Sequence, residues 1–173
     1  MSEVQGPRLP VVLLVDDDVR TTRRMAEMLR EDGFAVETAR DGAAAVARLS
    51  RSPIPDALVT ELTTAHADGL SIARFARNQR PGLPVLVLTG YPNLFDADAF
   101  AGGPPARLFT KPVEYAVLRT ALRDALQSAT ASEAAQTLIK QDLPAPPELE
   151  STAENARRNA LPGAQAIRAL RRP

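Results

Sequence analysis

Near its N-terminus the chain reads Val11-Val12-Leu13-Leu14-Val15-Asp16-Asp17-Asp18. A short, continuous run of β-branched and aliphatic residues is typical of a strand that is buried on both faces. Strands of this kind occur in parallel sheets that helices cover on both sides. Four further short apolar runs follow along the chain, at 34–36, 57–59, 85–88 and 108–109. These runs predict the strands of one parallel sheet.

Segments with helical spacing alternate with the apolar runs. They lie at 20–32, 43–49, 70–75 and 114–126, and a short helix is expected at 94–100. Gly33 is placed to end the first helix, and Asp18 to cap its start, because glycine and aspartate favour these positions. Five strand–helix units in about 120 residues indicate an α/β domain with helices on both faces of the sheet.

Composition excludes several classes of site. The 173 residues include no Cys and one His, at His66, so disulfides, thiol chemistry and Cys- or His-cluster metal sites are excluded. We expect His66, in the loop after the third strand, to be a bystander. The 21 basic and 21 acidic residues balance, so the chain as a whole gives no reason to expect a polyanionic partner.

The uncharged stretches are short. Two apolar ones, 9–15 and 83–95, fall well below the roughly 20 residues that a membrane span needs. The N-terminal region lacks a basic leader and a small-residue cleavage site, so no signal peptide is expected. We therefore expect a cytoplasmic protein without a membrane partner.

The character of the chain changes after about Ala129. We predict a first domain over 9–130, a helical extension with a Pro-rich linker over 131–150, and a basic tail over 151–173. The linker contains Leu143-Pro144-Ala145-Pro146-Pro147, which favours a stiff, extended chain. The tail has five Arg and no acid from Asn155 onward.

Chemistry-bearing residues follow four of the five predicted strands. In an open parallel sheet the carboxyl ends of the strands meet at one edge, where ligands bind. Carboxylates there suit Mg²⁺, a hydroxyl can donate to a phosphoryl oxygen, and a lysine neutralises the remaining charge. Each of these residue types alone is common in turns. Their occurrence together, at the ends of four separate strands, is not expected by chance. The groups are Asp16-Asp17-Asp18, Thr60-Glu61, Thr89-Gly90 and Thr110-Lys111-Pro112.

Over about 10–129 the sequence resembles a two-component response-regulator receiver domain. The stretches that carry the resemblance are Leu13-Leu14-Val15-Asp16-Asp17-Asp18, Asp68-Gly69-Leu70, Val87-Leu88-Thr89-Gly90 and Phe109-Thr110-Lys111-Pro112. The resemblance implies a flavodoxin-like (CheY-like) sheet of order 2-1-3-4-5 and a cis Lys111-Pro112 bond. It implies a histidine kinase or other signalling protein as partner, and a homodimer as a further expectation. The residues that it implies for Mg²⁺ are Asp16, Asp17, Glu61 and the backbone carbonyl near Thr63, with Thr89 as switch hydroxyl and Lys111 as phosphoryl-binding lysine.

This chain departs from the family at two positions that matter for chemistry. The phosphoacceptor Asp, seven residues before Asp68, is Glu61, whose extra methylene moves the carboxylate outward by about 1.5 Å. A misplacement of about 1 Å can cost a hundredfold in rate. The switch aromatic is Leu108, three residues before the lysine. We therefore predict an atypical receiver that is not phosphorylated in the usual way and acts through protein contacts.

Three interpretations of Glu61 stay open. It could reach Lys111 and Thr89 and mimic the modified state, it could be an inert surviving acid, or it could itself be phosphorylated.

A remote alternative for the whole domain is a haloacid-dehalogenase-type phosphatase, which also combines Asp, Thr and Lys at strand ends. That family needs Asp-x-Asp-x-Thr or Asp-x-Asp-x-Val, whereas Arg20 takes the last place here.

A second functional class is DNA binding through the tail. Glu154-Asn155-Ala156-Arg157-Arg158 and Ile167-Arg168-Ala169-Leu170 resemble the last helices of the Fis-type helix-turn-helix of redox and photosynthesis regulators. The third helix that such a unit needs is missing, and Pro162-Gly163 interrupts the recognition region. The tail is therefore a degenerate helix-turn-helix, a basic arm or disorder. The residues that could contact DNA phosphates are Arg157, Arg158, Arg168, Arg171 and Arg172.

Overall fold

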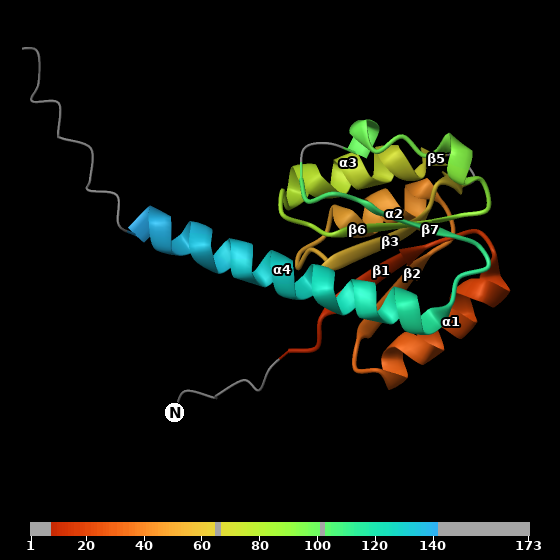
Figure 1. The fold of residues 1–173 in the computed structure, drawn as a ribbon, viewed down its shortest axis with the longest axis horizontal. Helices are drawn as coiled ribbons and strands as arrows, with labels where there is room; N and C mark the ends of the chain where they lie inside the picture. Colours follow the sequence, from red (N-terminus) through yellow and green to blue (C-terminus); the bar gives the residue numbers. More distant parts are fainter. Residues whose placement is uncertain (1–7, 65–66, 101–102, 142–173) are drawn as a thin grey trace, which may run out of the picture.

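The structure, a computed structural model, describes residues 8–64, 67–100 and 103–141. It shows a parallel sheet with helices on both faces (Figure 1). In chain order the elements are β1 (Val11–Val15), α1 (Val19–Glu31), β2 (Ala35–Ala39), α2 (Gly42–Leu49), β3 (Ala57–Glu61), β4 (Thr63–Thr64), β5 (Ala67–Asp68), α3 (Gly69–Gln79), β6 (Val85–Thr89), η1 (Pro92–Leu94), η2 (Asp98–Phe100), β7 (Arg107–Thr110) and α4 (Tyr115–Gln141). Among the described helices, none has the length and apolar character needed to cross a membrane.

The main sheet has the strand order β2-β1-β3-β6-β7, and all its neighbouring strands pair in parallel. Counted within this sheet the order is 2-1-3-4-5, so the predicted flavodoxin-like topology is confirmed. The chain leaves β1 toward β2 on one side and later returns to β3 on the other. The crevice of such a sheet therefore opens at the carboxyl ends of β1 and β3.

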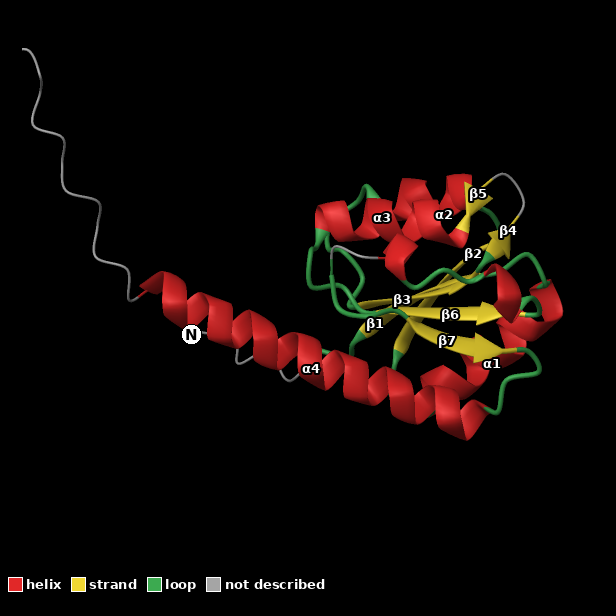
Figure 2. Ribbon diagram, turned by 45° about the horizontal axis from the view of Figure 1, so that its top comes forward, coloured by secondary structure: helices red, strands yellow, loops and turns green. Residues whose placement is uncertain are grey.

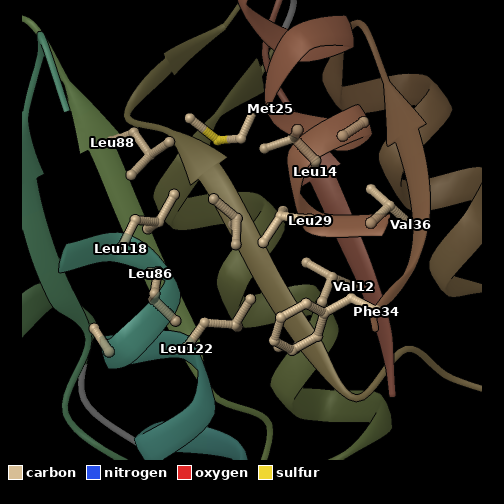
Figure 3. Packing of buried hydrophobic residues seen from close by; sticks show 14 residues of the cluster. Val12, Leu14, Met25, Leu29, Phe34, Val36, Leu86, Leu88, Leu118 and Leu122 are labelled. Atoms are coloured by element: carbon tan, nitrogen blue, oxygen red, sulfur yellow. The ribbon is translucent and has the colours of Figure 1, made fainter. Parts of the chain in front are cut away.

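Each strand of the sheet sends alternate side chains to opposite faces. On β1, Val12 and Leu14 pack under α1 and α4, whereas Leu13 and Val15 pack under α2 and α3. Figure 3 shows the first of these clusters, in which Leu118 and Leu122 of α4 meet Leu86 and Leu88 of β6. In the three central strands, β1, β3 and β6, both faces are buried, so their apolar runs are nearly continuous rather than alternating with polar residues.

Aspartates cap the first three helices, α1, α2 and α3, at the carboxyl edge of the sheet. Asp18 accepts hydrogen bonds from the N–H groups of Arg20 and Thr21, at 3.0 and 3.3 Å, and so caps α1 as predicted. Asp68 caps α3 in the same way, through the N–H of Ser71 at 2.6 Å. Gly33 follows α1 with a φ of 90°, which only glycine adopts without strain.

The predicted helix at 94–100 is wrong. Two 3₁₀ turns, η1 and η2, stand in its place. Between them the Asp96 carboxylate accepts from the N–H of Asp98 at 3.0 Å, a local bond that competes with helix formation. The guanidinium of Arg77, a buried side chain of α3, donates to the backbone carbonyls of Phe100 and Pro104 and so holds the end of this segment against α3.

The structure also adds a short strand pair after β3 and shows a longer last helix than the predicted segment 114–126. The short antiparallel pair β4–β5 follows β3, with Thr63 opposite Asp68, and the sequence patterns do not predict it. The last helix runs to Gln141, so the run of Ala and Ser after Ala129 extends it. The Lys111-Pro112 bond is cis, as the resemblance implied.

Candidate functional site

The carboxyl edge of the sheet brings Asp16, Glu61 and Lys111 into direct contact. Asp16 follows β1, Glu61 ends β3, and Lys111 follows β7. The Lys111 ammonium lies 2.6 Å from Asp16 Oδ2 and 2.5 Å from Glu61 Oε2. Asp16 and Glu61 are 3% and 7% exposed, so the lysine bridges two buried carboxylates.

Every oxygen of the two carboxylates has a protein donor. The second oxygen of Asp16, Oδ1, accepts from the N–H of Asp18 at 2.9 Å. The second oxygen of Glu61, Oε1, accepts from the N–H of Leu62 at 2.9 Å. Hydrogen bonds of this kind, in which one partner is charged, are stronger than neutral ones. The acidic pair is therefore satisfied entirely by groups of this chain.

The environment of Lys111 favours its charged form. Burial by itself lowers the pKa of the ammonium, but its hydrogen bonds and charge interactions with Asp16 and Glu61 outweigh burial and raise the pKa above the ordinary 10.5. At neutral pH the lysine is fully protonated and holds a positive charge between the two acids.

Thr89 lies at the same edge but is not joined to Glu61. Its side chain is fully buried at the end of β6, and its hydroxyl accepts from the N–H of Tyr91 at 3.1 Å. Its backbone carbonyl accepts from the N–H of Lys111 at 2.8 Å. Within the described residues, no hydrogen bond connects Glu61 to the Thr89 hydroxyl. If Glu61 mimics a phosphorylated residue, it is expected to contact both Lys111 and Thr89. In the described part of the chain, the structure shows the contact with Lys111 only.

The predicted magnesium ligands are only partly assembled. Asp17 is exposed, unlike its neighbour Asp16. Thr63 lies in the β4–β5 pair rather than in an open loop. In the part of the chain that the structure describes, no three acidic or histidine side chains are grouped so that they could hold one metal ion. As arranged, with Lys111 on both buried carboxylates, the residues do not fit Mg²⁺.

Gly69 explains why the loop after Glu61 has its shape. A Cβ at this position would lie 2.3 Å from the backbone oxygen of Glu61, far inside van der Waals contact. The Gly69 N–H donates to the Leu62 carbonyl at 2.7 Å. The start of α3 thus packs directly on the backbone that carries Glu61, which is a physical reason for glycine in the Asp68-Gly69-Leu70 motif.

Two of the contacts that complete the site had no signal in the sequence. The N–H groups of Asp18 and Leu62 come from the backbone, so side-chain patterns do not reveal them. Leu108, at the switch-aromatic position, is half-buried in β7 and packs against the second core cluster. His66 and the tail residues Arg157, Arg158, Arg168, Arg171 and Arg172 lie outside the described residues.

Comparisons with known proteins agree with this geometry. The family described as response regulator receiver domain matches residues 12–123. The transcriptional regulatory protein GlrR of Escherichia coli is 33% identical over 123 residues, which cover 70% of this chain and 28% of GlrR. The probable transcriptional regulatory protein TcrX of Mycobacterium tuberculosis is 38% identical over 115 residues, which cover 64% of this chain and 48% of TcrX.

A solved structure covers the same part of the chain. The response regulator receiver protein from Sinorhizobium medicae matches with a TM-score of 0.62 and 28% identity, over 70% of this chain and 98% of that protein. The chain thus spans less than half the length of the two curated relatives and nearly all of the solved receiver. The sheet order, the acidic pair and lysine at its carboxyl edge, and these matches agree that the chain belongs to the response regulator receiver domain family.

Proposed function

We propose that this protein is an atypical response regulator of a two-component pathway, whose receiver domain is held in one state by its own side chains. It acts by binding a histidine kinase or another signalling protein rather than by turning over a substrate. The observation that carries the proposal is the Lys111 ammonium bound at once to Glu61 and Asp16.

The position of Glu61 supports this proposal over an inert acid. Glu61 is buried, at 7% exposed, and burying an unpaired charge is costly. A carboxylate without a role at a strand end is therefore expected to lie in solvent. Glu61 is instead paired with Lys111 and hydrogen-bonded by Leu62. Its carboxylate thereby contributes a fixed negative charge at the phosphoacceptor position. Because Thr89 is not engaged, the mimicry extends to the lysine and not to the switch hydroxyl.

Magnesium has a smaller role in this proposal than in the family. Receiver domains generally bind Mg²⁺ at their acidic pocket. Here the two buried carboxylates already share the charge of Lys111, so a divalent ion could use Asp16, Asp17 and Glu61 only after the lysine gives up a carboxylate. We expect the resting state of this site to need no added metal.

Substitutions at Glu61 test the proposal. With acetyl phosphate as donor and intact mass as readout, the wild type is expected to gain a phosphoryl group at least about a hundredfold more slowly than Glu61→Asp, because the shorter side chain restores the family's geometry. Glu61→Gln keeps the size of the side chain but loses the charge that holds Lys111. We expect faster amide exchange over residues 107–114 in Glu61→Gln, and weaker binding of this variant to its partner protein.

Two results would count against the proposal. Labelling of the wild type as fast as Glu61→Asp would show that Glu61 is a working phosphoacceptor. Identical amide exchange and partner binding in Glu61→Gln and the wild type would show that the charge of Glu61 does not hold the receiver domain in one state, and that the acid is inert.

DNA binding through the basic tail is a second candidate function. Five arginines and no acids from Asn155 onward favour it, and GlrR and TcrX are both named as transcriptional regulatory proteins. In a gel shift at low salt, we expect any binding to be independent of sequence and to weaken steeply with salt. Replacing the five arginines by glutamine should abolish the shift. Unchanged binding in that variant would place the DNA contacts elsewhere.

A further inference from the structure

The last helix, α4, reaches well beyond the sheet. It begins at Tyr115, four residues after Lys111, crosses under the sheet and continues past the opposite edge (Figures 1 and 2). Its 27 residues correspond to about 40 Å at 1.5 Å per residue. One element therefore runs from the edge that carries the site to the far side of the domain.

The first half of α4 is held by packing and by a polar clamp. Leu118 and Leu122 are fully buried against the sheet. Asp32, at the end of α1, accepts from the Tyr115 hydroxyl and from Arg119, the latter at 3.3 Å. This half needs no further attachment.

The second half of α4 has little packing of its own. From 127 to 137, Ala129 is buried, Glu133 is partly buried and the other side chains are exposed. A cavity of about 370 Å³ lies beside this part of the helix, lined among others by Val85, Pro104 and Ala129. Burial of one alanine contributes too little apolar area to fix the orientation of the helix.

Charged groups supply the attachment that packing lacks. Arg80, at the end of α3, donates from Nε and Nη2 to the Glu133 carboxylate at 2.8 and 2.9 Å. Its Nη1 donates to Asp56 at 2.9 Å. Asp56 is fixed in turn by Arg8 at 2.9 Å and by the N–H of Val11 at 2.7 Å. The guanidinium is thus oriented by the body of the domain before it meets Glu133, so the pair loses less side-chain freedom than an isolated surface pair.

We propose that Arg80 and Glu133 latch the second half of α4 to the domain, and that the latched helix is a fixed connector between the site edge and the chain after Gln141. The bond to Arg80 also lowers the pKa of Glu133, so the latch stays charged at neutral pH. The connector is a positioning device that is independent of whether Glu61 is phosphorylated.

Hydrogen exchange of the full chain, read by mass spectrometry, tests the latch. In Glu133→Gln we expect amides 130–141 to exchange about tenfold faster, because this part of the helix then opens without the rest of the domain. Amides 116–126 should keep the wild-type rates. Arg80→Lys, which cannot make the two parallel bonds, should give an intermediate increase.

Asp124→Asn is the matched control on the same helix. Asp124 is exposed, and its carboxylate lies 3.9 Å from Arg107, beyond hydrogen-bond distance, so removing its charge should leave exchange at 130–141 unchanged. Wild-type exchange rates in Glu133→Gln would overturn the proposal. So would an equal increase in Asp124→Asn, because that would assign the effect to the net charge of the helix.

Discussion

Replacing Lys111 by methionine is expected to lower the free energy of unfolding by about 3 kcal/mol, the lower end of what breaking a buried ion pair costs. The lysine side chain is 27% exposed, which moderates the effect, but the side chains of Asp16 and Glu61, taken without their backbone, are only 4% and 9% exposed. Methionine keeps the length of the aliphatic stem, and Met25 and Met28 already line the adjoining cavity. The loss therefore reports on the charge and not on packing.

The stabilisation of the folded state by Lys111 is expected to fall at high pH. The pKa of Lys111 is raised in the folded protein, so its stabilisation is fully present below the ordinary value of 10.5 and is lost as the pH rises through the higher folded value. We expect the difference in the free energy of unfolding between the wild type and Lys111→Met to be fully present at neutral pH and to disappear under strongly alkaline conditions.

Urea unfolding near pH 7, without added metal, measures the difference, and Arg24→Met is the matched control. Arg24 is an exposed cation on α1 that lines the same cavity as Lys111, so its replacement should change the free energy of unfolding by less than about 0.5 kcal/mol. Added Mg²⁺ should restore part of the stability of Lys111→Met, because the two freed carboxylates then need a cation. A Lys111→Met protein as stable as the wild type would mean that the bridge contributes nothing.

The fold followed from the sequence because its signals are local and mutually consistent. The run from Val11 to Val15 is apolar at every position, which fits a strand with two buried faces, and Asp18 and Gly33 mark the ends of the helix that follows. The segment between β6 and β7 gave no such agreement. Its two turns are closed by local hydrogen bonds, and its end is held by Arg77, which lies 23 and 27 residues before the carbonyl groups that it binds and forms these bonds only in the folded chain.

The candidate site was predictable as a set of residues but not as a set of contacts. Strand ends placed Asp16, Glu61 and Lys111 at one edge, and the structure brings them together. That Glu61 meets Lys111 and not Thr89 depends on side-chain reach and on the N–H of Leu62. Asp17 shows the same limit, because adjacent residues at the end of a strand point in opposite directions and only Asp16 turns inward.

Leu122→Ala is expected to destabilise the protein by about 3 kcal/mol, within the 2–5 kcal/mol range for a buried leucine. Leu122 is fully buried and lies between α4 and the sheet, close to Leu86 and Leu118 (Figure 3). Truncation removes its contacts and leaves a cavity that rigid neighbouring strands cannot fill. The midpoint of urea unfolding should fall while the slope stays constant, since the surface exposed on unfolding is nearly unchanged.

Val117→Ala on the same helix separates packing from helix propensity. Val117 is 52% exposed, so its replacement removes little buried area, and alanine favours the helix slightly more than valine does. We expect a change below about 0.5 kcal/mol. If Leu122→Ala cost no more than Val117→Ala, the first half of α4 would not be anchored by the core. The connector would then depend on its charged contacts along its whole length, and Glu133→Gln should loosen the amides at 116–126 as well as those at 130–141.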